Sequence, residues 1–393
     1  MSIEWKETEL GKIAFTTSGG TPSRKNENYY SGGTIPWVKS GELEFGTITK
    51  TEEFITQAGI DNSSAKIFPK GTLLIALYGA TIGKLSFLGI DAATNQAVCG
   101  IFENDTVDLK YLYYFLLFQR PNLVRQGIGG AQPNISQTIL KKLMVPYPKE
   151  KSEQERIVAK IEELFSKLDN GVETLKKTKQ QLAVYRQAVL KEAFSSNEKS
   201  VKISTICTVV RGGSPRPAGD ERYYNGTIPF LKVADLTNSN DMYLNTHTYT
   251  IKEAGLRKTR KVPCNTLLLS NSGATLGVPK ICTFETTFND GIAAFLDLKT
   301  NQEYLPYHYY FWLSKLPEMR AINQGAAQPN LNTAIIGDVE IPHYEFEKQQ
   351  QIAEWIESRL SVCENIQKTV DTALQQAEAM RQSILKKAFE GEL

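Results

Sequence analysis

The chain repeats most of its own sequence once, and this repeat constrains its fold more than any other feature. The matching segments occur in the same order in both copies, with almost constant spacing. They are Gly19-Gly20-Thr21-Pro22 with Gly212-Gly213-Ser214-Pro215, Gly33-Thr34-Ile35-Pro36-Trp37-Val38-Lys39 with Gly226-Thr227-Ile228-Pro229-Phe230-Leu231-Lys232, Gly79-Ala80-Thr81-Ile82-Gly83 with Gly273-Ala274-Thr275-Leu276-Gly277, Ala131-Gln132-Pro133-Asn134-Ile135 with Ala327-Gln328-Pro329-Asn330-Leu331, and Arg186-Gln187-Ala188-Val189-Leu190-Lys191-Glu192-Ala193-Phe194 with Arg381-Gln382-Ser383-Ile384-Leu385-Lys386-Lys387-Ala388-Phe389. Two copies of one unit imply two similar domains, and therefore two similar sites, in one molecule.

Length and composition leave room for two globular cores. A chain of 393 residues, 41% hydrophobic and 22% charged, has the composition of an ordinary globular protein. No apolar run reaches the ~18 residues that a membrane span needs, and the first residues lack the order of a signal peptide. We therefore expect a cytoplasmic protein without membrane contact. The scattered cysteines are expected to be reduced thiols, not disulfides or zinc ligands: Cys99, Cys207, Cys264, Cys282 and Cys363.

The first part of each copy is expected to be a mixed α+β domain. Short runs of β-branched and aromatic residues, bounded by Gly, Pro or Asn, predict strands. In copy one they cover residues 34–39, 72–77, 85–90 and 97–102, and in copy two residues 227–233, 266–271, 279–284 and 292–298. An aromatic-rich helix is expected next, at 109–119 and at 304–315. Short connections between strands favour an α+β fold over a Rossmann-type sheet.

The second part of each copy is expected to be one long helix. Apolar residues recur there at strict intervals of seven, namely Ile161, Leu168, Leu175, Leu182 and Val189 in copy one and Ile356, Cys363, Val370, Ala377 and Ile384 in copy two. Such heptads predict that the two helices form an antiparallel coiled coil with a pseudo-two-fold axis. The alternative is an amphipathic helix that lies on its own domain. Gly171 costs roughly 1 kcal/mol of helix stability and predicts a bend or weak point.

These patterns divide the chain into four parts. We expect a first globular domain at residues 1–150, a central long helix at 151–195, a second globular domain at 196–345 and a C-terminal long helix at 346–393. The polar run Ser195-Ser196-Asn197-Glu198-Lys199-Ser200 is expected to link the central helix to the second copy.

Sequence patterns of catalytic sites are missing. The glycine loop at residues 79–83 resembles a phosphate-binding P-loop only faintly, because Leu85 stands where Ser or Thr must ligate magnesium. His247, His308 and His343 have no counterparts in copy one, and no Gly-x-Ser-x-Gly elbow occurs. We therefore expect no catalytic, cofactor-binding or metal-binding residue in this chain.

Basic residues beside the repeated loops are the candidates for contact with DNA. The net charge of +2 is no nucleic-acid signature by itself, so the argument is local. Lysine and arginine can neutralise phosphates, and arginine can read guanine in the major groove. The candidates are Arg24, Lys25, Lys39, Lys84, Arg211, Arg216, Lys232, Arg257, Lys258, Arg260 and Lys261. A solvated surface is the alternative for each single residue, whereas the run from Arg257 to Lys261 favours nucleic acid.

The two copies agree in these loops and diverge between them. Residues 44–68 and 237–262 share almost nothing recognisable. A common scaffold with different inserts is suited to two readers of different sequences.

Taken together, these motifs resemble the specificity subunit of type I restriction–modification systems over essentially the whole chain. The motifs that carry the resemblance are Gly19-Gly20-Thr21-Pro22, Gly33-Thr34-Ile35-Pro36-Trp37, Gly79-Ala80-Thr81-Ile82-Gly83, Glu153-Gln154-Glu155-Arg156-Ile157 and Leu385-Lys386-Lys387-Ala388-Phe389-Glu390-Gly391-Glu392-Leu393. Copy two departs at Gln349-Gln350-Gln351-Ile352, where the acidic residue is lost and the contact at the helix start is in doubt.

The resemblance implies a subunit without chemistry of its own. Two target-recognition domains would each read one half of a bipartite sequence in double-stranded DNA, and the helices would set the unread spacer. The subunit would hold two modification (methyltransferase) subunits, which use S-adenosylmethionine. Through these it would recruit restriction subunits that use ATP and Mg²⁺. A coiled-coil adaptor that binds protein is the alternative, while a self-contained restriction or methyltransferase enzyme would need motifs that this chain lacks.

Overall fold

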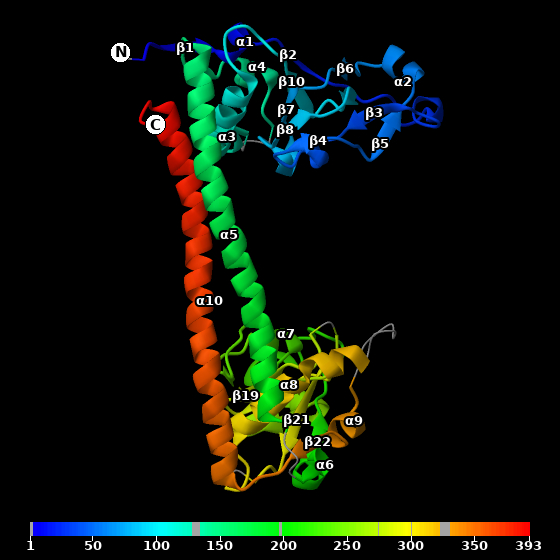
Figure 1. The fold of residues 1–393 in the computed structure, drawn as a ribbon. Helices are drawn as coiled ribbons and strands as arrows, with labels where there is room; N and C mark the ends of the chain where they lie inside the picture. Colours follow the sequence, from blue (N-terminus) through cyan, green and yellow to red (C-terminus); the bar gives the residue numbers. More distant parts are fainter. Residues whose placement is uncertain (1–2, 128–133, 196–198, 274, 300, 323–330) are drawn as a thin grey trace. The chain divides into compact units, whose positions relative to one another are not determined.

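The structure is a computed structural model that describes residues 3–127, 134–195, 199–273, 275–299, 301–322 and 331–393. It divides into two compact units, one formed by Met1–Leu175 with Thr372–Leu393 and the other by Lys176–Asp371. Figure 1 shows that each unit contains one mixed α/β domain and part of both long helices. Most of the repeated Ala-Gln-Pro-Asn segments, Ala274 and the middle of the expected linker lie outside the described residues.

The first domain contains a five-stranded, a four-stranded and a two-stranded sheet. Its elements are β1 (Trp5–Glu9), α1 (Leu10–Ile13), β2 (Thr16–Ser18), η1 (Glu27–Tyr29), β3 (Ile35–Val38), η2 (Ser40–Glu42), β4 (Thr47–Ile48), β5 (Glu53–Ile55), α2 (Gln57–Asp61), β6 (Ile67–Phe68), β7 (Leu73–Ala76), η3 (Gly79–Thr81), β8 (Leu85–Leu88), β9 (Ala92–Thr94), β10 (Val98–Ile101), α3 (Leu109–Gly127), α4 (Gln137–Lys141) and β11 (Met144–Pro148). One sheet has the order β2-β10-β7-β8-β4, the other has the order β5-β3-β9-β6, and β1 pairs with β11.

The second domain repeats this topology strand for strand. Its elements are β12 (Ser200–Lys202), α6 (Ile203–Ile206), β13 (Thr208–Arg211), β14 (Tyr224–Leu231), α7 (Val233–Thr237), β15 (Tyr243–Leu244), β16 (Tyr249–Ile251), η4 (Glu253–Lys258), β17 (Arg260–Val262), β18 (Thr266–Ser270), β19 (Pro279–Cys282), β20 (Thr286–Phe288), β21 (Ile292–Leu296), α8 (Leu305–Ile322), α9 (Thr333–Gly337) and β22 (Glu340–Pro342). The sheets are β13-β21-β18-β19-β15, β16-β14-β20-β17 and β12-β22. The repeat in sequence is therefore a repeat in fold.

Central strands of both domains are buried on both faces. Alternate side chains of a strand point to opposite faces, so Leu73 and Ile75 of β7 join the core with α3, while Leu74 and Ala76 join a smaller core with β6 and β10. The predicted strands coincide with β3, β7, β8 and β10 in one copy and with β14, β18, β19 and β21 in the other. The expected α+β architecture of two tandem domains is confirmed.

Two long helices, α5 (Lys151–Ala193) and α10 (Phe346–Phe389), follow the domains and pack against each other. The heptad residues lie on their inward faces: Ile161, Leu182, Val189, Ile356, Cys363, Val370 and Ala377 are buried, and Leu168, Leu175 and Ile384 are half-buried. The pairing of individual heptad residues of α5 with those of α10 stays a prediction. The helix continues through Gly171, where we expected a bend or weak point, without interruption.

Ion pairs between α5 and α10 show the direction of the helix pair. Lys179 of α5 lies 2.8 Å from Asp371 of α10 in the second unit. In the first unit Asp169 of α5 pairs with Arg381 of α10, whose guanidinium also covers the ring of Phe165. Residues that come earlier on α5 thus pair with residues that come later on α10, so the helices are antiparallel.

The repeated ending of each helix completes the core of the domain that belongs to the other copy. Phe389 packs within 5.2–5.8 Å, between ring centroids, of Tyr111, Phe115 and Phe118 in the first domain. Its counterpart Phe194 packs 5.2 Å from Tyr307 and 5.5 Å from Phe311 in the second domain. This reciprocal packing explains why the Ala-Phe ending recurs in both copies, and why the first compact unit includes the end of the chain.

Candidate nucleic-acid interface

The Gly-Gly loops hold the candidate cations close to the small sheets. Gly19 and Gly20 follow β2, and a Cβ on either would collide with the backbone of Thr94 or Ser64. Gly212 and Gly213 follow β13 and would collide in the same way with Asn289 and Lys258. Only glycine allows this approach, so the loop that carries Arg24 in one copy and Arg216 in the other is fixed against its sheet.

Lys39 and Lys232 occupy equivalent positions directly after β3 and β14. The backbone N–H of Lys39 donates to the carboxylate of Glu42 at 2.8 Å, and that of Lys232 donates to Asp235 at 2.7 Å. Each carboxylate turns the chain at the same point after the strand. The lysines predicted from the repeat therefore occupy matching places in the two domains.

In the first domain, Arg24 and Lys39 are bound by carboxylates of the same domain. The ammonium of Lys39 lies 2.9 Å from Glu52 and 3.0 Å from Glu53, and the guanidinium of Arg24 lies 2.6 Å from Glu53. Hydrogen bonds to Glu52 and Glu53 raise the pKa of Lys39. Burial raises the pKa of Glu53, but the hydrogen bonds and charges of Lys39 and Arg24 outweigh it and hold that pKa below its usual range. The Glu53 carboxylate is thus charged at neutral pH.

In the second domain, Lys232 meets an aromatic ring instead of a carboxylate. Its ammonium lies 3.4 Å from the ring centroid of Tyr249. Tyr249 pairs with Phe230 on β14, just as Glu53 pairs with Trp37 on β3, so Tyr249 and Glu53 occupy equivalent positions. A cation over a ring keeps its charge.

The cluster from Arg257 to Lys261 lies at the end of η4 and on β17, and all four of its basic residues are exposed. Lys261 pairs with Glu285 at 2.6 Å, and Arg260 donates to the backbone oxygen of Arg211 at 2.9 Å. Arg257 and Lys258 have no ion pair with any residue that the structure describes. The cluster thus offers two uncommitted cations beside the Gly-Gly loop.

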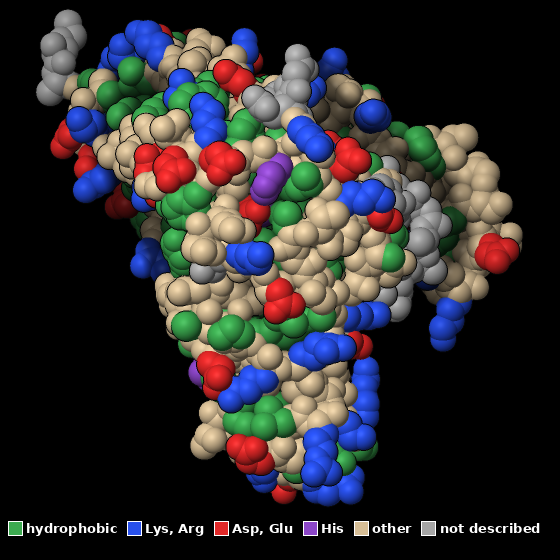
Figure 2. Space-filling model, turned by 90° about the horizontal axis from the view of Figure 1, so that it is seen from below, with side chains coloured by type: hydrophobic (Ala, Val, Ile, Leu, Met, Phe, Trp, Pro, Cys, Tyr) green, Lys and Arg blue, Asp and Glu red, His purple; other side chains and the backbone are tan. Residues whose placement is uncertain are grey.

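The remaining candidates are Arg211, Arg216, Lys25 and Lys84. Arg211 donates to the backbone oxygen of Asp290, and Arg216 lies 3.9 Å from the Asp290 carboxylate. Lys25 is exposed before η1, and Lys84 is half-buried after η3. Figure 2 shows Lys and Arg side chains mixed with Asp and Glu over much of one face and gathered toward its lower right edge. The structure brings Arg24 and Lys39 together, and it brings Arg211 near Arg216 and Arg260.

A buried glutamine at the start of each long helix is a structural residue that the sequence reasoning missed. Gln154 accepts from the N–H of Asp108 at 2.9 Å and donates to the oxygens of Pro148 and Thr106 at 2.8 and 3.1 Å. Gln349 accepts from the N–H of Tyr304 at 2.9 Å and donates to the oxygen of Tyr344 at 2.8 Å. Gln154 and Gln349 occupy matching positions in the repeat, and this recurrence could have identified them from the sequence.

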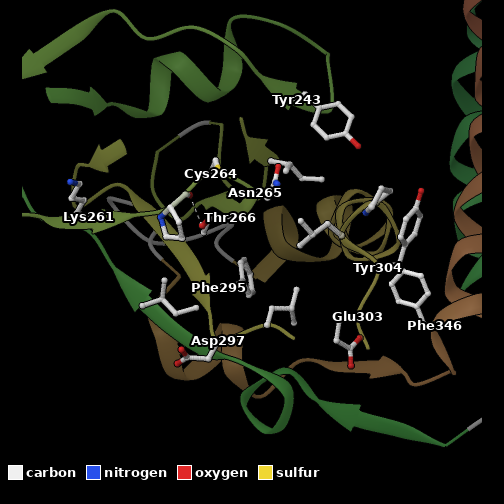
Figure 3. Close-up of a pocket in the computed structure, with 16 residues that line it drawn as sticks. Tyr243, Lys261, Cys264, Asn265, Thr266, Phe295, Asp297, Glu303, Tyr304 and Phe346 are labelled. Carbon is white, nitrogen blue, oxygen red and sulfur yellow. Dashed lines mark hydrogen bonds between the residues drawn. The ribbon is translucent and has the colours of Figure 1, made fainter. Parts of the chain in front are cut away.

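A cavity of about 760 Å³ lies in the second domain near the start of α8 and α10. Figure 3 shows Tyr304 and Phe346 side by side at one end of it, with ring centroids 5.6 Å apart and Glu303 below them. The Glu303 carboxylate is already engaged by His308 at 2.8 Å and by Gln349 at 3.0 Å.

Among the residues that the structure describes, no group of His, Cys, Asp and Glu could hold a metal ion, and no helix is long and apolar enough to cross a membrane.

Comparison with known proteins places this architecture. The chain is 28% identical over 270 residues to the type I restriction enzyme MjaIX specificity subunit of Methanocaldococcus jannaschii, which covers 59% of this chain and 61% of that protein. The alignment thus spans less than two thirds of that relative. The fold is similar to the HsdS subunit of Thermoanaerobacter tengcongensis, with a TM-score of 0.59, 19% identity and coverage of 99% and 97% of the two chains.

A second solved structure agrees more closely in fold. It comes from work on complex assembly and conformational transition of the type I restriction–modification system, and it has a TM-score of 0.81 at 18% identity over the full length of both chains. The family described as type I restriction modification DNA specificity domain matches this chain twice, at residues 2–183 and 196–376. The chain therefore belongs to the specificity subunits of type I restriction–modification systems and carries their DNA specificity domain twice.

Proposed function

We propose that the two domains read the two halves of a bipartite sequence in double-stranded DNA. The observation that carries this proposal is one framework, repeated strand for strand, that holds two unlike segments between the ends of β3 and β14 and the starts of β7 and β18. Framework loops with exposed cations can hold the phosphate backbone, while the unlike segments supply different side chains to the bases. Arg24, Lys39, Lys232, Arg257 and Lys258 are the first candidates for these contacts.

The proposed role of α5 and α10 is to set the unread spacer and to hold two modification subunits. The chain itself would carry no chemistry. S-adenosylmethionine would be bound by the modification subunits, and ATP and Mg²⁺ would be used by restriction subunits recruited through them. The complex would act in the cytoplasm, where its DNA substrate lies.

Two measurements test this function. Host DNA should carry methyl groups at one bipartite motif when the chain is expressed with its partner subunits, and should lose them when the chain is deleted. Purified chain should bind long duplex DNA with an affinity that falls steeply with salt, because neutralised phosphates release counterions. If DNA binding did not depend on salt, and if host DNA kept its methyl groups after deletion of the chain, a protein-binding adaptor would be favoured instead.

A further inference from the structure

The unlike segments of the two domains differ in charge. Residues 39–70 contain four basic and five acidic residues, whereas residues 232–264 contain six basic and three acidic residues. Both segments run from the end of one framework strand to the turn before another, where Thr72 and Thr266 make the same hydrogen bond to a proline oxygen. Because the framework is shared, the difference in charge belongs to the segments.

In the first domain, this segment neutralises two cations of the framework, Arg24 and Lys39. Glu53 binds both Arg24 and Lys39, and Glu52 adds a second contact to Lys39 at 2.9 Å. A phosphate that approached either cation would have to displace a carboxylate and would be repelled by its charge. Cations that are already paired neutralise fewer phosphates, so fewer counterions leave the DNA and the contribution of these cations to affinity is reduced.

In the second domain, the position equivalent to Glu53 leaves Lys232 without a carboxylate partner in the described part of the chain, although Arg216 there lies beside Asp290. Tyr249 replaces the carboxylate of Glu53, so the charge of Lys232 is not neutralised. Added cations also appear beside the Gly-Gly loop. A Cβ on Gly20 would meet Ser64 and a Cβ on Gly213 would meet Lys258, which shows that Lys258 occupies the place of a serine.

We propose that the two domains divide the work of binding DNA. The second domain supplies most of the phosphate affinity, whereas Glu52 and Glu53 restrain the first domain, which contributes selection of sequence with little non-specific affinity. This restraint favours specificity, because a reader that binds any duplex tightly is retained at competing sites. The inference rests on the proposed function, since it assumes that both domains contact duplex DNA.

The test measures binding of the full chain to a random-sequence duplex over a range of salt concentrations. Glu52→Gln with Glu53→Gln keeps the side-chain shapes and removes the charges that hold Arg24 and Lys39. Freeing two cations should steepen the slope of log affinity against log salt by about one to two units and raise affinity several-fold at low salt. Replacing Lys232, Arg257 and Lys258 by Gln should flatten the slope by about two to three units.

A matched cycle isolates the restraint. Lys39→Gln in the natural chain should change the slope little, whereas in the chain with both glutamates replaced it should remove about one unit. The Glu52→Gln variant alone, at a side chain 73% exposed, gives the same direction of change if the double variant does not fold. Thermal unfolding reports folding of each variant.

The outcomes separate the two claims. An unchanged slope in the glutamate variants, beside a flatter slope in the variant of the second domain, would overturn the division of work alone. Absence of salt-dependent binding by the natural chain would overturn the proposed DNA contact itself.

Discussion

At the scale of single residues, the joint between each domain and its long helix depends on one glutamine. Gln154 and Gln349 are fully buried, and each closes hydrogen bonds from the segment before the aromatic helix to the segment before the long helix. The loss of the acidic residue in copy two left this contact in doubt from sequence. The structure places the contact on the glutamine that both copies retain.

Replacing Gln154 or Gln349 by Ala should destabilise the protein. Each change leaves buried backbone groups without partners, which costs about 1–3 kcal/mol per group. Chemical unfolding followed by circular dichroism measures the loss. Gln351→Ala is the matched control at an exposed position of α10, and its effect should stay within about 0.5 kcal/mol. Equal stability of the control and the two buried variants would show that the joint does not depend on these amides.

A second residue-scale feature distinguishes the second domain. His308 stands where the first domain has Leu112, and Glu303 stands where it has Val107, as the matching bonds to Gln154 and Gln349 establish. Glu303 binds His308 at 2.8 Å and lies 3.6 Å from His343. Burial raises the pKa of Glu303, but its bond to His308, the nearby charges and its bond to Gln349 hold that pKa below the usual range.

The stability of the second domain should therefore fall in acid because of Glu303. A carboxyl group with a lowered pKa in the folded state stabilises the protein above its unfolded value, about 4.3, and that contribution is lost as pH falls through the folded pKa. Glu303→Gln should flatten the dependence of stability on pH below about 4.3, measured by urea unfolding. The exposed Glu340, changed to Gln, serves as control. If stability fell with pH in the same way in the natural chain and in the Glu303→Gln variant, this role of Glu303 would be contradicted.

At the scale of elements, the sequence predicted the long and regular parts. Heptads that persist for five repeats identify α5 and α10, and continuous apolar runs identify β7 and β18 because both faces of these strands are buried. The two- or three-residue strands β4, β5, β6 and β9 were not predicted, since their pairing partners are distant in sequence and too few residues show an alternating pattern.

The candidate interface was predictable only in part. Lys39 and Lys232 were named as candidates because they recur in both copies. Their different environments could not be found, because Glu53 and Tyr249 reach them through strand pairing that brings together residues in segments with no resemblance. The pairing of Arg24 and Lys39 with Glu52 and Glu53 is therefore visible only in the structure.

The helix pair makes a testable prediction as a ruler. Inserting one heptad after Leu175 in α5 and a matching heptad after Leu374 in α10 preserves both apolar stripes and lengthens each helix by about 10 Å. About 10 Å corresponds to roughly three base pairs. Small adjustments of the domains on the DNA should take up part of this added length. We expect a longer unread spacer with both half-sites unchanged, determined by sequencing the methylated motif of the assembled complex.

Two insertions with different phase supply the control for that experiment. Adding two residues at the same points rotates each stripe by about 200° and should prevent assembly of the helix pair. An active complex that carries the heptads and keeps its natural spacer would show that the helices do not set the distance.

At the scale of the whole molecule, the chain consists of two copies of one domain, and the long helix that follows each copy ends in the core of the other copy's domain. Phe389 belongs to the core of the first domain and Phe194 to the core of the second. A simple division at residue 150 therefore does not separate the domains, because the end of α10 completes the first one. An exchange of domains has to leave α3, α5 and α10 in place.

The most direct measurement of the central claim is such an exchange, made in the assembled complex and read by methylome sequencing. Residues 16–101, which run from β2 to β10 and exclude the aromatic helix that contacts Phe389, would be replaced by those of a relative with a different target. Independent readers on a shared framework predict that one half of the methylated motif changes to that of the relative while the other half and the spacer stay the same. A motif in which both halves change, or neither does, would contradict the account.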